Sequence, residues 1–354
     1  MHFFSAGPAK LPTSALKECH QGFLDVGTGE SILEISHRSD YFETVINTAT
    51  SLVKELLQIP ENYSILWMQG GATLQFAAAA MNVHQRTKQT IHYIISGAWS
   101  QKAFQECEKL GIPCTTVAES MTATPKGDMK YLQDGYLYYC ANETVHGVEY
   151  KSVPNHPNII CDMSSNFLSR PVDVSKYAII YAGVQKNVGP AGVTLVIVRN
   201  DLITKTTKIP TMMDYNVFAN SNSLYNTPPV SSIYVCKYVL QWIKNEGGLS
   251  KMESKNAAKS QLIYAAINDN SIYHCPVEAH CRSNMNIPFR ICTDGKPDEK
   301  LENKFIQLAE QRGLYGLKGH RSVGGIRVSL YNAVDLESVQ VLHDFMTEFA
   351  KSQK

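Results

Sequence analysis

A series of short, mostly continuous apolar segments constrains the fold of this chain more than any other feature. Six of them are predicted to be β-strands: residues 64–68, 90–95, 135–140, 158–161, 177–181 and 193–198. Helical stretches alternate with them, and residues 74–83 and 229–245 are the clearest of these. Strands that are apolar on both faces are typical of a parallel sheet covered by helices on both sides. The segment from about residue 60 to 250 is therefore predicted to be α/β.

The pattern changes after about residue 255. A strand is predicted over residues 286–291, a charged helix over 298–312, a second β segment over 325–330 and a closing helix from Asp335. A chain of 354 residues is also too long for one ordinary core. We therefore predict a large domain of residues 16–254 and a smaller α+β domain formed by residues 1–15 and 255–354.

The composition is that of a globular protein without a broad charged surface. Hydrophobic residues make up 44% of the chain and charged residues 18%. The 33 Lys and Arg residues nearly balance the 32 Asp and Glu residues, which gives a net charge of +1. This balance argues against nucleic acid or an anionic membrane surface as a partner, because both attract strongly basic proteins.

Three further features predict a cytoplasmic protein. The start, MHFFSAGPAKLP, has neither the basic region nor the long apolar run of a secretory signal. The longest apolar stretches are far shorter than the roughly 20 residues that span a bilayer. The nine cysteines form no CxxC pair or Cys/His cluster. We interpret them as reduced thiols and predict no metal site.

Lys186 stands where the chain would be expected to turn between two buried strands. It follows the apolar residues 177–182 and is flanked by Gly189, Pro190 and Gly192. A lysine shielded from water has a lowered pKa and becomes a usable nucleophile and base. The alternative is an ordinary loop lysine whose charged end extends to the solvent.

Two other features fall at the ends of predicted strands. Gly70, Gly71, Ala72 and Thr73 lie between a strand and a helix, where backbone N–H groups can bind an anion. The alternative is an ordinary turn in which Thr73 caps the helix. Asp162 directly follows the strand 158–161, at the edge where open parallel sheets bind ligands. The alternative is that its carboxylate caps a following helix.

An anion cradle, a carboxylate and a buried amine at the same edge of a sheet match the needs of one cofactor. Pyridoxal phosphate carries a phosphate for the helix N-terminus, a ring nitrogen for the carboxylate and an aldehyde for the lysine. The three features together therefore favour a pyridoxal-phosphate enzyme over any of their separate interpretations.

Longer motifs make the chain resemble a known family over essentially its whole length. They are FSAGPAKLP near the N-terminus, EISHRS at 34–39, GAWS at 97–100, ANETVHGV at 141–148, CDMSSNFLSRPVDVSKY at 161–177, YAGVQKNVGPAG at 181–192, YNTPP at 225–229 and KGHRSVGGIRVSLYNA at 318–333. With them the chain resembles the phosphoserine aminotransferase family of class V aminotransferases. That resemblance implies the PLP-dependent transferase fold type I, which is aspartate-aminotransferase-like.

The resemblance also implies how the cofactor is held. Lys186 would bind the aldehyde covalently, and Asp162 would pair with the ring nitrogen. Trp99 matches the aromatic residue that stacks on the ring, although core packing alone would also explain it. Four further residues match contacts to the ring oxygen or the phosphate: Thr144, Gln185, Ala72 and Thr73. Two more, Asn226 and Thr227, would reach the phosphate from the partner subunit of a homodimer.

The substrate positions are basic. Arg327 matches the arginine that binds the substrate α-carboxylate through a bidentate fork. His37, Arg38, His320 and Arg321 match the set that receives a phosphate or the side-chain carboxylate of glutamate. One position departs from the pattern, because Thr73 is an arginine in some members of the family. No role is implied for His146.

The implied reaction transfers the amino group of L-glutamate to 3-phosphohydroxypyruvate. It yields O-phospho-L-serine and 2-oxoglutarate, in serine biosynthesis. Other class V activities, such as alanine–glyoxylate transamination or cysteine desulfuration, are alternatives. A Rossmann oxidoreductase is disfavoured because the glycine fingerprint is missing. A non-catalytic binding protein is disfavoured because each expected catalytic position is filled.

Overall fold

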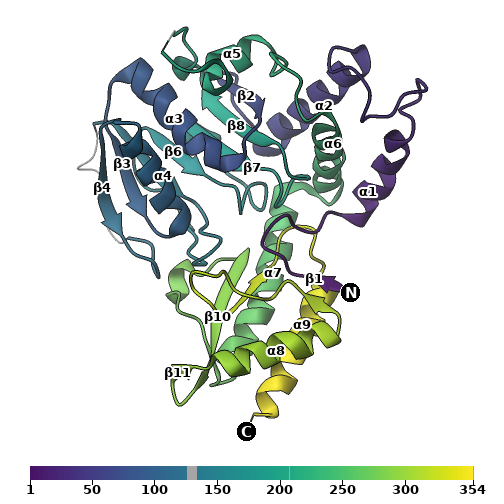
Figure 1. The fold of residues 1–354 in the computed structure, drawn as a ribbon, viewed down its shortest axis with the longest axis vertical. Coiled ribbons are helices and arrows are strands. Elements are labelled where there is room, and N and C mark those ends of the chain that lie inside the picture. The colour runs from purple at the N-terminus through teal and green to yellow at the C-terminus, as the bar shows by residue number, and fades with distance from the viewer. Residues whose placement is uncertain (126–133, 207, 354) are drawn as a thin grey trace.

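The computed structural model describes residues 1–125, 134–206 and 208–353 and has two lobes (Figure 1). The larger lobe contains a seven-stranded sheet in the order β2-β8-β7-β6-β5-β3-β4. Those strands are β2 (Tyr63–Met68), β8 (Thr194–Arg199), β7 (Ile179–Gly183), β6 (Ile159–Asp162), β5 (Tyr136–Cys140), β3 (Ile91–Ile95) and β4 (Cys114–Glu119). The α/β prediction is confirmed.

Strand directions decide which strand ends meet. Strands β7, β6, β5, β3 and β4 are mutually parallel, whereas β8 is antiparallel to both of its neighbours, β7 and β2. Strand β2 therefore runs in the same direction as β7. As a result, the segments that follow β2, β5, β6 and β7 all emerge at one edge of the sheet.

All six predicted strands exist, but β4 was missed. None of its side chains is buried at this outer edge of the sheet, and two of them are threonines. A strand with one open face carries no continuous apolar run, so the pattern that identified the others could not identify it. The strand predicted from residue 177 begins at Ile179 instead.

Helices cover both faces of the sheet because side chains alternate along each strand. On one face, Trp67, Leu137 and Leu195 pack in a core with α2 (Asp40–Leu57) and α6 (Val230–Asn245). On the other face, the neighbouring residues Leu66, Tyr138 and Val196 pack in a second core. That core includes residues of three helices: α3 (Gly71–Thr87), α4 (Ala98–Lys109) and α5 (Tyr215–Asn220).

The smaller lobe is α+β, as predicted. Strand β10 (Asn286–Thr293) pairs with β13 (Ile326–Ser329), β9 (Tyr273–His274) and β11 (Lys296–Pro297), all antiparallel. Helices α8 (Glu299–Gln311) and α9 (Leu336–Lys351) supply Phe305, Phe345 and Phe349 to a core that is separate from the other two. The predicted strand at 286–291 and helix at 298–312 are therefore present.

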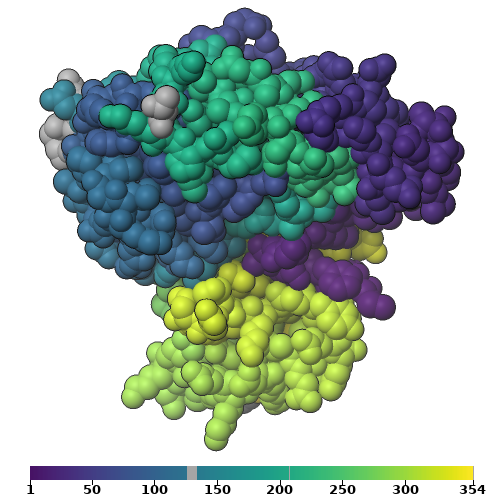
Figure 2. Space-filling view, turned by 45° about the horizontal axis from the view of Figure 1, so that its top comes forward, coloured from purple at the N-terminus to yellow at the C-terminus, as the bar shows by residue number. Residues whose placement is uncertain are grey.

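Two segments connect the lobes. Helix α7 (Gly248–Asn268) contributes Leu249 and Met252 to the large lobe's core and Ile263 and Ile267 to the small lobe's core. The predicted domain boundary at 254/255 falls inside this helix and stays a prediction. The N-terminal segment lies at the waist of the molecule (Figure 2), where β1 (His2–Phe3) pairs with β12 (Leu314–Tyr315) of the small lobe. Helix α1 (Thr13–Cys19) packs in the large lobe.

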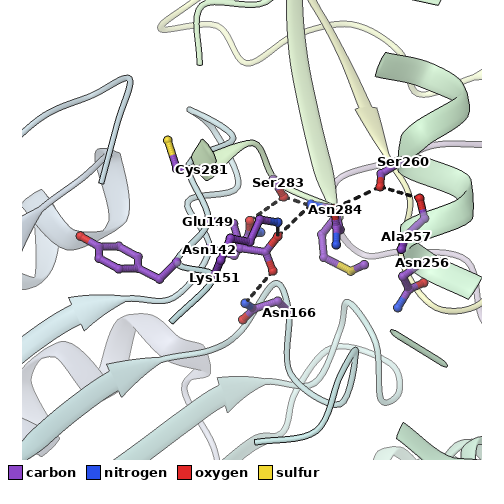
Figure 3. Close-up of polar contacts among 12 residues, drawn as sticks. Asn142, Glu149, Lys151, Asn166, Asn256, Ala257, Ser260, Cys281, Ser283 and Asn284 are labelled. Atoms are coloured by element: carbon purple, nitrogen blue, oxygen red, sulfur yellow. Dashed lines mark hydrogen bonds and ion pairs between the residues drawn. The ribbon is translucent and has the colours of Figure 1, made fainter. Parts of the chain in front are cut away.

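The joint between the lobes is polar and buried (Figure 3). The Glu149 carboxylate accepts hydrogen bonds from Asn166 Nδ2 at 3.3 Å and Asn284 N at 2.8 Å. Nearby, Ser283 Oγ donates to Asn142 Oδ1 at 2.6 Å. A buried polar group that loses its hydrogen-bond partner destabilises the folded protein. These contacts therefore favour one relative placement of the lobes.

All nine cysteines are free thiols, and seven of them are buried. Within the described residues, no helix combines the length and the apolar character needed to cross a bilayer.

Candidate active site

A cavity of ≈ 440 Å³ opens at the sheet edge where the parallel strands end. It is lined by residues that follow β2, β5, β6 and β7, by the N-terminal segment and by the small lobe. The predicted site residues among them are Ala72, Thr73, Trp99, Thr144, Asp162, Gln185, Lys186, His320 and Arg327. Residues distant in the sequence are thus brought to one cavity by the strand order.

Lys186 is buried, with 9% of its surface exposed. Its Nζ atom donates a hydrogen bond to Thr144 Oγ1 at 2.7 Å. Burial lowers the pKa of the Lys186 amine, and the negative charge of Asp162 opposes that shift. The side chain therefore does not extend to the solvent, and the alternative of an ordinary loop lysine is wrong.

Asp162 is the last residue of β6 and is also buried. Its Oδ1 atom accepts a hydrogen bond from Ser164 N at 2.8 Å. Burial raises the pKa of the Asp162 carboxyl group, while the hydrogen bonds from Ser164 and the charge of Lys186 lower it. Turns rather than a helix follow Asp162, so the alternative role as a helix cap is wrong.

The anion cradle is the first turn of α3. This helix begins at Gly71, and Gly70 is its N-cap with φ +86°. A Cβ atom on Gly70 would lie 2.6 Å from Leu74 Cδ2, so a side chain does not fit there. Thr73 lies inside the first turn, which means that the alternative in which it caps the helix is wrong. The first N–H groups of a helix have no acceptor within it, so this turn can bind an anion.

Trp99 and Gln185 lie on the wall of the same cavity. The Trp99 ring centroid is 5.9 Å from Lys186 Nζ. The indole Nε1 atom is buried, and no hydrogen-bond partner for it is found among the described residues.

The small lobe contributes the cationic side of the cavity. Arg327, on β13, donates from Nη1 to Thr144 O at 3.4 Å. Burial lowers the pKa of the Arg327 guanidinium. Burial also lowers the pKa of His320, and the positive charges of Arg327, Arg321 and Lys102 add to that effect. Arg321 itself is exposed next to His320, outside the lining of the cavity.

Besides Arg321, four predicted residues are not brought to this cavity within one chain. His37 and Thr227 line a different cavity of ≈ 390 Å³, and Arg38 is exposed beside His37. Asn226 Oδ1 accepts a hydrogen bond from Gln69 Nε2 at 3.5 Å, just before the α3 cradle. The His37 ring is buried, and burial lowers its pKa.

Several cavity residues had no predicted role. Ala6, Gly7, Asn142 and Ser164 line the cavity, and Ser164 holds Asp162 as described above. The motifs FSAGPAKLP and ANETVHGV include the first three of these residues, so the sequence did contain a pattern that could have pointed to them. The motifs do not predict a role for each residue, because such contacts depend on how distant segments pack.

The cavity fits pyridoxal phosphate. It offers a buried amine, a buried carboxylate and a helix N-terminus with open N–H groups. Residues 1–342 match the family model described as aminotransferase class V. The chain therefore belongs to the class V aminotransferases and is a pyridoxal-phosphate-dependent enzyme.

Within this class, the relatives similar over nearly the whole chain include phosphoserine aminotransferases. The one from Drosophila melanogaster is 48% identical over 361 residues, which cover 99% of each chain. The solved structure from Bacillus circulans subsp. alkalophilus is 42% identical, with a TM-score of 0.93, and covers 99% of this chain and 98% of that one. A pyridoxal-phosphate-bound structure from Trichomonas vaginalis is 38% identical, with a TM-score of 0.91, and covers 97% and 98%. The chain belongs to this branch of the family.

Proposed function

We propose that the chain transfers the amino group of L-glutamate to 3-phosphohydroxypyruvate. The products are 2-oxoglutarate and O-phospho-L-serine, and the reaction serves serine biosynthesis in the cytoplasm. The observation that carries the proposal is the buried Lys186 amine beside a cavity that Asp162, the α3 N-terminus and Arg327 also line. The names of the similar proteins support the choice of substrates.

Each part of the cofactor has residues suited to hold it. Ala72 and Thr73 would bind the phosphate at the start of α3. Asp162 would pair with the ring nitrogen, a contact favoured because, among the described residues, Ser164 is the one that donates to the buried carboxylate. The residues that would contact the rest of the ring and the phosphate side are Trp99, Thr144 and Gln185.

Lys186 is the residue that moves protons. When bound, pyridoxal phosphate supplies an aldehyde that takes up the amino group and a ring that accepts the electrons released at Cα. The Lys186 amine removes the proton from the Cα atom of glutamate, and it delivers a proton to Cα of phosphoserine in the opposite half of the cycle. Burial suits it to this task, because its lowered pKa makes the neutral form available. Thr144 keeps the amine in place between these steps.

The cationic side of the cavity selects the substrate. The Arg327 guanidinium binds the α-carboxylate, since its fork matches two carboxylate oxygens. His320 and Arg321 receive the phosphate of one substrate or the side-chain carboxylate of the other. In this proposal, these groups would give a chain with a net charge of only +1 a local binding site for phosphorylated acids.

We further propose that the active unit is a homodimer with shared sites. His37, Arg38, Asn226 and Thr227 lie outside the cavity of their own chain, so a second copy would have to bring them to it. The same segments expose Leu33 and Tyr225, which are 66% and 53% accessible. Large apolar side chains on a segment that also carries site residues are typical of an interface.

Spectroscopy and substrate comparison test the proposal together. The protein loaded with pyridoxal phosphate should show a visible absorbance band that glutamate changes, and it should use 3-phosphohydroxypyruvate faster than glyoxylate. Lys186→Ala should lose both the band and turnover, whereas Lys176→Ala, at an exposed position, should keep both. Activity retained by Lys186→Ala would contradict the mechanism. A preference for glyoxylate would overturn the choice of substrate.

A further inference from the structure

Glu143 is a fully buried carboxylate to which the proposed reaction gives no task. It lies three residues after β5, directly before Thr144, and is 0% exposed. A buried carboxylate needs several hydrogen-bond donors to offset the loss of water. The hydrogen-bond donors of Glu143 therefore show which part of the structure its side chain binds.

Those donors belong to the first turn of α4. Glu143 Oε2 accepts from Trp99 N at 3.0 Å, and Oε1 accepts from Ser100 N at 2.8 Å and Ser100 Oγ at 2.6 Å. N–H groups in the first turn have no acceptor within the helix, and a side chain at the N-cap usually satisfies one of them. The N-cap of α4 is Gly97, which has no side chain. Glu143 takes over this role from a distant part of the chain.

His146 satisfies the remaining group of that turn. Ala98 N donates to His146 Nδ1 at 3.3 Å. Because Nδ1 accepts, the proton of a neutral ring is on Nε2. Burial lowers the pKa of His146 and so favours the neutral ring. The backbone N–H groups of residues 98, 99 and 100 thus all donate to side chains of the loop 143–146.

Gly97 provides the space for this contact. Its φ is 170°, an extended conformation that other residues also adopt. A Cβ atom on Gly97 would nevertheless lie 2.5 Å from Glu143 Cδ, closer than packed atoms approach. Glycine is required there because the carboxylate lies against the backbone, and not because of the backbone conformation.

The joined segments carry two walls of the active site. The loop carries Thr144, whose hydroxyl holds Lys186 Nζ, and the helix carries Trp99, whose ring lies 5.9 Å from that atom. We infer that Glu143 is a positioning residue that fixes Trp99 and Thr144 relative to Lys186, with His146 as its support. This inference rests on the proposed cofactor roles of Trp99 and Thr144.

Glu143→Gln tests the inference with little change in volume. An amide has one oxygen and one NH₂ group, so one of the two backbone donors loses its acceptor and faces a donor instead. Misplacing groups by about 1 Å can cost roughly 100-fold in rate. We therefore expect kcat to fall about 10- to 100-fold and KM for glutamate to change little, since Arg327 is untouched. The visible circular dichroism of bound pyridoxal phosphate should also decrease, because Trp99 shifts.

Glu302→Gln is the matched control. Glu302 is 4% exposed in the small lobe, where it accepts hydrogen bonds from Arg290 Nε and Ile291 N. The same substitution should lower the thermal unfolding temperature there but leave kcat and the dichroism unchanged. A Glu143→Gln protein with wild-type kcat and dichroism would overturn the inference. So would an equal loss of kcat and dichroism in Glu302→Gln.

A double-mutant cycle keeps the test valid if Glu143→Gln folds poorly, and it does not depend on the cofactor. In the unloaded protein, Gly97→Ala should lower the unfolding temperature, because its Cβ displaces the carboxylate. The same change should cost much less in a Glu143→Ala background, where the clashing atoms are gone. Equal costs in both backgrounds would contradict the contact. If the wild type binds no pyridoxal phosphate at all, the proposed function fails, whatever this cycle shows.

Discussion

Two buried lysines show why one is suited to chemistry and the other is not. Lys259 is 2% exposed, and its Nζ atom donates to three backbone carbonyls, those of Leu330, Tyr331 and Val334. All three protons of its ammonium group are used, so it fastens the chain between β13 and α9. Lys186 Nζ has the Thr144 hydroxyl as its close partner and faces a cavity. Burial lowers the pKa of both side chains, but only the second amine has room to react.

At this scale, Arg327→Lys should raise KM for glutamate by about 10- to 100-fold, with a smaller effect on kcat. A lysine keeps the charge but loses the planar fork, and each 1.4 kcal/mol of lost binding is about tenfold. Steady-state kinetics with both substrates measure the effect. Arg282→Lys is the control, because Arg282 bonds Val277 O and Asn268 Oδ1 away from the cavity. An unchanged KM in Arg327→Lys would exclude Arg327 as the carboxylate ligand.

At the scale of the element, the first turns of three helices have different partners. Helix α3 leaves its first turn open to the cavity, whereas the first turn of α4 is closed by Glu143 and His146. Helix α9 shows a third arrangement. Its N-cap, Asp335, accepts hydrogen bonds from Ser338 N at 2.7 Å and from Lys10 Nζ at 2.6 Å. That last contact ties the N-terminal segment to the small lobe.

Asp335→Asn should remove a pH-dependent part of the stability. Partial burial alone would raise the pKa of Asp335, but the bonds from Lys10 and Ser338 outweigh it and lower the pKa. A carboxyl group with a lowered folded pKa stabilises the fold above its unfolded pKa of about 3.9 and loses this effect as the pH falls further. Wild type should thus exceed the variant by about 0.5–1 kcal/mol near pH 7, and the difference should vanish in acid.

Unfolding measured from pH 7 down to about pH 1 checks this expectation, because the effect is lost only as the pH falls through the lowered pKa of Asp335. Asparagine can still cap the helix, so the comparison isolates the bond to Lys10. Lys10→Met should lose a similar amount, and the double variant should lose no more than either single one. If the difference in unfolding free energy between wild type and Asp335→Asn stays constant with pH, the charge of Asp335 does not contribute to stability.

At the scale of the whole molecule, the homodimer that we propose would divide the site between two copies. One chain holds the amine, the carboxylate and Arg327 at the cavity, but it holds Arg38 and Asn226 elsewhere. A protein built in this way would be inactive as a monomer, because no single chain assembles the complete set.

Mixing two inactive variants tests this division. A Lys186→Ala chain has an inactive cavity and intact donor loops, whereas an Arg38→Ala, Asn226→Ala chain has the reverse. Random pairing makes half of the dimers mixed, and each mixed dimer restores one of its two sites. Activity should therefore recover to about a quarter of the wild-type value after subunit exchange. Each variant exchanged with itself is the control. No recovery in the mixture, despite exchange seen by native mass spectrometry, would contradict shared sites.

The buried strands, and the site residues at the edge of the sheet where the parallel strands end, could be predicted from the sequence. Residues 64–68 and 193–198 are apolar along both faces, so they had to lie inside a covered sheet. Lys186 and Asp162 were expected at one edge because parallel strands end together, and the structure places both at the same cavity. The half-exposed strand β4 and the N-cap of α3 were not predicted correctly, since each depends on what packs beside it.

By itself, the sequence determined the α/β sheet, the small α+β lobe and a set of candidate residues for pyridoxal phosphate, because these follow from local patterns and motifs. Only the tertiary structure decided that Glu143 caps α4, that Gly97 makes room for it, and that His37 and Thr227 lie outside their own chain's cavity. Those facts depend on contacts between segments distant in the sequence. No local pattern records them, because hydrogen bonds and packing between such segments exist only once the sheet has set their positions.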